Sequence, residues 1–277
     1  MSTITVTPIA GALGAEVSGI DLARPLAPDA VRRIRQAWLD HLVLFFRDQQ
    51  LTPASFLALA QAFGTPVEYP MVKGLPGYPL ITEVIKREDE RTNFGGVWHS
   101  DTTYLEQPAM AAMLYALEVP PSGGDTIFAN QYLAYERLSA PLRQFLDGLV
   151  AINSSEKADV SRTREDMIRA AGDDRPRPSY AAEHPVVRTH PETGRRSLYV
   201  NIAHSAQFKG MSEAESAPIL DQLFRHQVSA EFTCRFSWRP GSLAFWDNRC
   251  TQHYPVNDYH GHRRSMLRIS LAGDRPR

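Results

Sequence analysis

The chain has 277 residues, a formal net charge of -1 and two cysteines. This length allows one domain with a substantial core, and the near-zero charge gives no reason to expect a nucleic acid or an anionic membrane as a partner. Two cysteines indicate a reducing compartment without a disulfide framework, and no leader-like start or long apolar run is present, so we expect a cytoplasmic protein with no membrane partner.

Strands and helices alternate in the first part of the chain. β-Branched residues broken by glycines predict a strand pair over residues 5–17, and residues 42–46 form an apolar run typical of a buried strand. Apolar residues at helical spacing predict a helix over about residues 30–41. A Thr-Pro start at Thr52 predicts a second helix, which Gly64 ends.

The tetrapeptide Trp-His-Ser-Asp at residues 98–101 contains the first candidate metal ligands. His99 and Asp101 are two positions apart, so both side chains project to one side of an extended strand and can reach one ion. Two imidazoles and one carboxylate hold non-haem Fe(II) on one face and leave the opposite face open, and His253 offers the second imidazole. Taken alone, the His-x-Asp triplet is more often a surface histidine beside a capping aspartate.

A polar segment over residues 153–183 separates the two halves of this metal motif. Long polar segments inside a compact domain are either functional lids or solvated insertions, and the position of this one favours a lid. His184 and His190 follow, in a pattern typical of a strand that ends in a tight turn, which indicates structural roles for both.

The next elements are a helix and a strand. A Ser-x-x-Glu capping box at Ser212 predicts a helix to about residue 228. Aromatic and polar residues then alternate over residues 232–238, which predicts a strand with one buried face. Cys234 lies on that face and is most simply a small core residue.

Arg264 and Arg268 follow His253 by 11 and 15 residues. Their even separation puts both on one face of a strand, and two guanidiniums directed at an enclosed site suggest recognition of a carboxylate or sulfonate. An exposed basic strand edge has the same spacing. The nearby metal motif favours the enclosed anion site.

Strands flank both halves of the metal motif, with few helices between them. This order favours an antiparallel sandwich or barrel over a doubly wound sheet. We therefore predict a mainly β fold with flanking helices, in a single domain over residues 1–277.

Two segments resemble a known family: WHSDTTYLEQPAMAAMLYALEVPPSGGDTIFAN and GSLAFWDNRCTQHYPVNDYHGHRRSMLRISLAGDRP. Both are similar to the Fe(II)/2-oxoglutarate-dependent taurine and phenoxyacetate-herbicide dioxygenases, and the similarity runs from about Val6 to the C-terminus. It implies a double-stranded β-helix, or jelly roll, with helices packed on one side.

The same resemblance implies a set of cofactors and the residues that bind them. His99, Asp101 and His253 would be ligands of Fe(II). Arg264 would pair with the distal carboxylate of 2-oxoglutarate, with help from Thr126. The enzyme would use O2 to convert 2-oxoglutarate to succinate and CO2 while it hydroxylates a second substrate.

The second substrate is expected to be a small organic anion. By resemblance, Arg268 holds its anionic group. Around that arginine, the expected pocket residues are Tyr69, Met71, Val72, Phe94 and Val97. Such a pocket lacks partners for an ammonium and favours an apolar body, so we expect poor activity on taurine and better activity on an aryloxyalkanoate, alkyl sulfonate or alkyl sulfate.

The alternative within the same family is a taurine-type sulfonate dioxygenase, and two functions of other classes use the same ligands. A zinc hydrolase would also bind two imidazoles and a carboxylate, although it leaves the two arginines without a common purpose. A non-catalytic, metal-bound jelly roll would need neither the arginines nor an open coordination position. For the dioxygenase we further expect a homo-oligomer, either a dimer or a tetramer.

Overall fold

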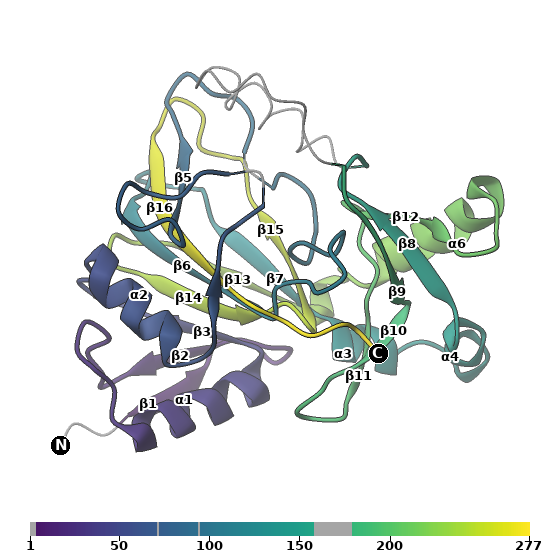
Figure 1. Ribbon diagram of the computed structural model, residues 1–277, viewed down its shortest axis with the longest axis horizontal. Coiled ribbons are helices and arrows are strands. Elements are labelled where there is room, and N and C mark those ends of the chain that lie inside the picture. Colours follow the sequence, from purple (N-terminus) through teal and green to yellow (C-terminus); the bar gives the residue numbers. More distant parts are fainter. Residues whose placement is uncertain (1–3, 71, 94, 158–178) are drawn as a thin grey trace.

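The computed structural model describes residues 4–70, 72–93, 95–157 and 179–277. It is mainly β with flanking helices, which confirms the predicted class (Figure 1). In the described chain the largest sheet has eight strands, in the order β1 (Thr5–Pro8), β2 (Ala15–Ser18), β3 (Val43–Phe46), β14 (Leu243–Asp247), β6 (Ala111–Glu118), β16 (Arg264–Leu271) and β4 (Pro66–Val67), with β5 (Thr82–Lys86) also paired to β16. The expected N-terminal strand pair is present as β1 and β2.

A second sheet faces one side of the large sheet. Its strands are β13 (Thr233–Phe236), β7 (Thr126–Asn130) and β15 (Thr251–Pro255), all antiparallel. Phe45 of β3 stacks on Phe236 of β13 with ring centroids 4.0 Å apart. The ring centroids of Phe128 in β7 and Trp246 in β14 are 5.7 Å apart. Apolar packing between the two faces therefore positions the strands that carry the candidate ligands.

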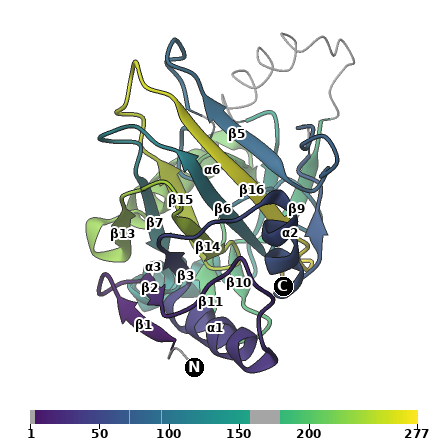
Figure 2. The ribbon, with the colours of Figure 1, turned by 90° about the vertical axis from the view of Figure 1, so that its left-hand side faces the viewer.

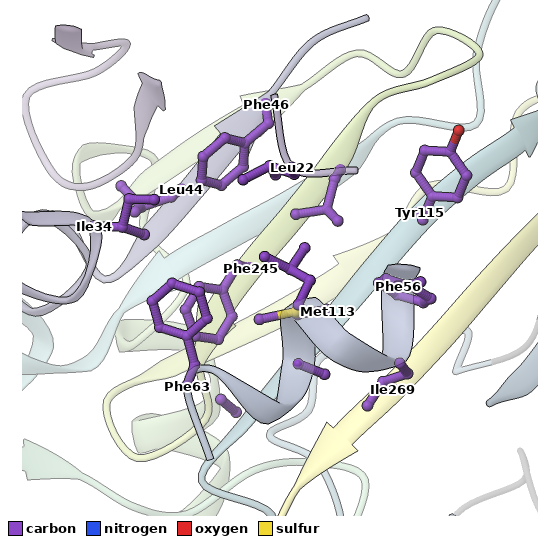
Figure 3. Close-up of a cluster of buried hydrophobic side chains, with 14 of the residues drawn as sticks. Leu22, Ile34, Leu44, Phe46, Phe56, Phe63, Met113, Tyr115, Phe245 and Ile269 are labelled. Carbon is purple, nitrogen blue, oxygen red and sulfur yellow. The ribbon is translucent and has the colours of Figure 1, made fainter. Parts of the chain in front are cut away.

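The helices α1 (Pro28–His41) and α2 (Pro53–Gln61) cover the other side of the large sheet (Figure 2). Trp38 of α1 stacks on Phe245 of β14 at 4.6 Å, and Figure 3 shows Phe63 against the same ring. Because β3 has apolar layers on both sides, all four of its residues are buried, as the uninterrupted apolar run predicts. Helix α1 begins at Pro28, two residues before the expected start, because proline is preset for the first helical turn.

A smaller group of elements lies beside the two sheets, at the right of Figure 1. It contains β8 (Val150–Ser154), β9 (Ala181–Pro185), β10 (Val187–Thr189), β11 (Arg196–Leu198), β12 (Ser205–Phe208), α3 (Gln131–Glu136), α4 (Ala140–Leu146), α6 (Glu213–His226) and the 3-10 helix η1 (Ala230–Phe232). Ser212 and Glu215 form the predicted capping box of α6, which ends two residues before the expected position. Phe232 belongs to η1, so the predicted strand starts one residue later.

The polar segment at residues 153–183 begins and ends in strands. Asn153 pairs with Ala182 and Ser154 with Ala181, in the β8–β9 ladder. Residues 158–178, the central part of this segment, lie outside the described residues. The lid therefore stays a prediction.

Helices α1 and α6, at 14 residues each, are too short to cross a bilayer, and none of the other described helices is long and apolar enough to do so either.

Candidate metal centre and co-substrate cavity

The two candidate histidines are neighbours in the second sheet. His253 lies on β15, and His99 forms an isolated antiparallel bridge with it, with backbone N···O distances of 3.1 and 2.9 Å. Their imidazole centroids are 4.1 Å apart. Asp101 follows the bridge at the start of a turn, so the chain leaves the extended conformation sooner than the His-x-Asp spacing suggests.

The donor atoms of these three residues converge. His99 Nε2 is 3.6 Å from Asp101 Oδ1, and His253 Nε2 is 4.0 Å from the same oxygen. Asp101 Oδ1 is buried, and no described residue donates a hydrogen bond to it. A buried carboxylate oxygen without a partner is costly unless a cation contacts it, so this atom fits a metal ion bound between the two imidazoles.

Neighbouring groups hold the candidate ligands in orientation. His99 Nδ1 donates to the Val97 carbonyl at 2.8 Å, which fixes the ring orientation and makes Nε2 the nitrogen with the lone pair. Asp101 Oδ2 accepts a hydrogen bond of 2.9 Å from Asn248 Nδ2, and Trp246 Nε1 donates to Asn248 Oδ1 at 3.0 Å. Asn248 is not among the site residues predicted from the sequence, although its position inside the second family-like motif could have indicated it.

Close packing also restricts the backbone beside His99. Gly95 has φ +72, and a Cβ at this position would lie 2.8 Å from Cε1 of the imidazole. Glycine is therefore required here for both its conformation and its size.

The electrostatic surroundings favour the metal-binding protonation states. Burial raises the pKa of Asp101, but the charge of Arg268 and the two imidazoles outweigh it and hold this pKa well below its ordinary value. Arg268 Nη2 lies 2.5 Å from Asp101 Oδ2. Burial and then the neighbouring His99 lower the pKa of His253. An ionised carboxylate and neutral imidazoles are the forms that bind metals.

A cavity of about 440 Å³, a volume that includes space open to solvent, adjoins the histidines. Its lining consists of Val84, His99, Leu114, Thr126, Phe128, Trp246, His253, Pro255, Arg264 and Arg268. Both arginines of β16 are thus buried on the face that encloses this cavity, at 6% and 4% exposure, which excludes an exposed basic strand edge. The two arginines, the two histidines and Thr126 therefore line one pocket.

The Arg264 end of the cavity has unused hydrogen-bond donors. Arg264 Nε and Nη2 are buried and have no hydrogen-bond partner within the described parts of the chain. Thr126 Oγ1 accepts a hydrogen bond of 3.0 Å from Trp238 Nε1, and the Trp238 ring centroid lies 5.6 Å from Arg264 Cζ. The sequence indicated only that Trp238 is buried. Its contact with Thr126 arises from the β13–β7 pairing.

The residues expected around the substrate divide into three groups. The Tyr69 ring centroid lies 4.7 Å from Arg268 Cζ. Val72 and Val97 are half-buried and do not line the 440 Å³ cavity. Met71 and Phe94 lie outside the described residues.

Tyr69 also borders a neighbouring cavity of about 560 Å³. Its lining consists of Val67, Glu68, Tyr69, Pro70, Thr102, Leu105, Gln107, Ala109, Ser270, Ala272 and Gly273. Tyr69 therefore lies between Arg268 and a second space, large enough for the body of a small organic molecule.

A family model described as the taurine catabolism dioxygenase TauD, TfdA family matches residues 5–270. The chain belongs to the TauD/TfdA family. Members are oxidoreductases, so the protein is an enzyme that depends on Fe(II), 2-oxoglutarate and O2. Of the three functions that the sequence motifs allowed, the comparisons therefore support the dioxygenase rather than the zinc hydrolase or the non-catalytic jelly roll.

Relatives within the TauD/TfdA family match almost the whole chain. The alpha-ketoglutarate-dependent sulfate ester dioxygenase of Pseudomonas putida is 38% identical over 281 residues, which cover 99% of this chain and 91% of that protein. The alkylsulfatase of Acinetobacter baylyi is 37% identical over 273 residues, or 96% of this chain and 84% of that protein. The crystal structure of a taurine dioxygenase from Burkholderia xenovorans has a TM-score of 0.83 at 37% identity and covers 99% of this chain and 90% of its own.

A second buried cluster has donor atoms close enough to hold a metal, namely His190, Asp247 and Cys250. Here the carboxylate is already satisfied. Arg249 donates to Asp247 Oδ1 at 2.8 Å and to Oδ2 at 2.7 Å, and Oδ2 also accepts from His190 Nε2 at 3.0 Å. These bonds make the cluster a structural ion pair, in line with the structural role predicted for His190.

Proposed function

We propose that His99, Asp101 and His253 are the iron ligands of this dioxygenase. The observation that carries the proposal is the buried, unpartnered Asp101 Oδ1 facing two imidazole Nε2 atoms. Bound Fe(II) would supply the oxidation of 2-oxoglutarate to succinate and CO2 that is coupled to hydroxylation of the second substrate. Three protein ligands leave positions for a chelating 2-oxo acid and for O2.

We further propose that Arg264 and Thr126 bind the distal carboxylate of 2-oxoglutarate. Two unused donors of Arg264 suit a two-point contact with a carboxylate. Because Trp238 donates to Thr126 Oγ1, the hydroxyl proton of Thr126 is free to be donated to the same carboxylate.

Arg268 is the residue we assign to the anionic group of the second substrate. It lines the same cavity as Arg264, four residues further along β16, beside Asp101 and the Tyr69 ring. One of its amino groups contacts Asp101, while Nε has no hydrogen-bond partner among the residues described. The remaining N–H groups can bind a sulfate, sulfonate or carboxylate.

The substrate class we propose is an organic sulfate, sulfonate or carboxylate, with an alkyl sulfate ester first. The names of the Pseudomonas putida and Acinetobacter baylyi relatives support the sulfate ester. An aromatic ring over Arg268 and the apolar residues of the 560 Å³ cavity favour an alkyl or aryl body. Met71, Val72, Phe94 and Val97 stay predicted pocket residues.

A substrate panel tests this class. We expect succinate release with an alkyl sulfate or an aryloxyalkanoate to exceed that with taurine, because an ammonium buried without partners is costly. Preference for taurine would contradict the pocket assignment but not the iron site. In a separate test, anaerobic addition of Fe(II) and 2-oxoglutarate should produce a weak visible charge-transfer band, and its absence would contradict the iron and co-substrate assignments.

We also propose that the two facing sheets form a jelly roll in one domain over residues 1–277. The antiparallel β13-β7-β15 sheet packed on the large sheet supports this fold. The lid at residues 153–183 and a dimeric or tetrameric assembly stay predictions. Limited proteolysis with and without substrate tests the lid, and light scattering of the purified protein tests the assembly.

A further inference from the structure

Lys86 lies beside Arg264 on the inner face of the large sheet. The antiparallel β5–β16 register pairs Lys86 with Arg264 and Val84 with Met266. Side chains two positions apart on a strand share a face, so Lys86 projects from the same face of β5 as Val84, which lines the 440 Å³ cavity. Directly opposed residues of an antiparallel pair have Cβ atoms about 5 Å apart, so the two cationic side chains are neighbours.

The ammonium of Lys86 is buried without an oxygen partner. The residue is 4% exposed, and Nζ has no hydrogen bond to the described residues. It lies 4.0 Å from the ring centroid of Tyr259, a cation–π contact that leaves its N–H donors unused. Burial lowers the pKa of Lys86, and the charge of Glu90 partly opposes this shift.

Lys86 and Arg264 form an opposed pair of cations, and Glu90, the acidic residue whose charge acts on Lys86, accepts a hydrogen bond of 2.6 Å from the backbone N–H of Arg87. The acidic residue that interacts electrostatically with Arg264 is Asp125. Its carboxylate is paired at 2.6 Å with Arg235, which leaves it little capacity to neutralise the pair. Unused donors on both Lys86 and Arg264 therefore indicate a place for an external carboxylate.

We propose that Lys86 is a second cation of the 2-oxo acid pocket and shares the distal carboxylate of 2-oxoglutarate with Arg264. This rests on the proposed role of Arg264. The chemical consequence is selectivity: a 2-oxo acid with a second carboxylate gains a contact that a monocarboxylic 2-oxo acid of equal length cannot make. If Lys86 only packs on Tyr259, no such selectivity depends on it.

The test compares the binding of two 2-oxo acids by calorimetry. Protein loaded with Mn(II), which does not oxidise the co-substrate, is titrated with 2-oxoglutarate or with 2-oxovalerate, which lacks the distal carboxylate. Lys86→Met keeps the aliphatic stem over Tyr259 and removes the charge. In Lys86→Met the charged hydrogen bond to the distal carboxylate is lost. We therefore expect the Kd of 2-oxoglutarate to rise about tenfold and the Kd of 2-oxovalerate to stay unchanged. Lys86→Arg should recover part of the loss.

Lys209→Met is the matched control. Lys209 follows β12, its side chain is 59% exposed, and its ion pair is with Glu183. This variant should bind both 2-oxo acids as the wild type does. If Lys86→Met does not fold, as judged by thermal unfolding, the shorter neutral side chain of Lys86→Gln provides the same comparison.

Each outcome separates this inference from the proposed function. An equal rise in both Kd values for Lys86→Met would mean structural damage and would overturn the inference. An unchanged Kd for Lys86→Met, with a raised Kd for Arg264→Ala, would also overturn it while the proposed role of Arg264 stands. If Arg264→Ala binds 2-oxoglutarate as the wild type does, the co-substrate assignment itself fails.

Discussion

Two buried clusters of this protein each contain a histidine and an aspartate but differ in how their polar atoms are satisfied. The donor atoms of His99, Asp101 and His253, like those of the cluster around Asp247, lie within 4.8 Å of one another. Asp101 Oδ1 has no donor in the described structure, whereas both oxygens of Asp247 accept hydrogen bonds from Arg249. Proximity alone therefore does not separate the proposed metal site from an internal ion pair, and the unsatisfied Asp101 Oδ1 is the observation that supports a metal at the first cluster.

The two buried arginines Arg249 and Arg264 repeat this contrast. Arg249 bonds Asp247 twice and Glu192 Oε1 at 2.7 Å, and these carboxylates raise its pKa against the opposing effect of burial. Arg264 has two buried donors unused, and burial lowers its pKa. The first arginine is satisfied by carboxylates within the fold, and the unused donors of the second support the co-substrate role proposed for it.

The largest expected effect is loss of turnover on removal of an iron ligand. His99→Ala or His253→Ala should reduce substrate-dependent succinate formation to background, because three protein ligands are the minimum for this facial site. Thermal unfolding should show that each variant still folds, with a modest loss of stability for His99→Ala because the hydrogen bond from Nδ1 to the Val97 carbonyl is removed. Near-native turnover in either variant would show that the residue is wrongly assigned.

Removal of Asp247 should instead reduce stability. Asp247→Ala leaves Arg249 as a buried charge with one partner fewer, which costs about 3–5 kcal/mol. Urea unfolding measures this change, and iron content per folded molecule should stay near that of the wild type. Selective loss of iron without loss of stability would reverse the roles of the two clusters.

Arg264→Ala should act on the co-substrate more than on the fold. The half-saturating concentration of 2-oxoglutarate should rise about 30-fold or more, since a lost contact between a buried arginine and a carboxylate costs about 2 kcal/mol or more. Steady-state kinetics measure this, and Arg264→Lys should recover part of it. An equal rise for the second substrate would contradict the division of roles between Arg264 and Arg268.

The smallest of these effects is expected for Asn248→Ala. Asn248 donates to Asp101 Oδ2 and orients the carboxylate without being a proposed ligand. Loss of such an outer contact typically weakens metal affinity by about 10–100-fold, and we expect the lower end here because Arg268 still contacts Asp101 Oδ2. Competition of the protein with a chelator for Mn(II) measures the change, and Asn248→Asp, which replaces the donor by a second carboxylate, should not restore the affinity.

Local patterns predicted much of the fold. The Thr52 and Ser212 caps and the helical spacing before residue 42 located three helices to within a few residues, because capping and periodicity depend on near neighbours in the chain. The alternation of aromatic and polar residues predicted a strand from residue 232, but residues 230–232 form the 3-10 helix η1. Phe232 packs into a hydrophobic cluster with residues distant in the chain, and this packing cannot be read from the local pattern.

The sequence by itself determined the family, the His-x-Asp motif with its distant histidine, and the even spacing of the two arginines. These depend on residue identity and separation along the chain. The tertiary structure decided which polar atoms are left without partners and which residues support them: Asn248 beside Asp101, Trp238 on Thr126 and Lys86 opposite Arg264. The physical reason is strand register, which brings together residues over 100 positions apart and thereby sets whether a buried donor or acceptor is satisfied.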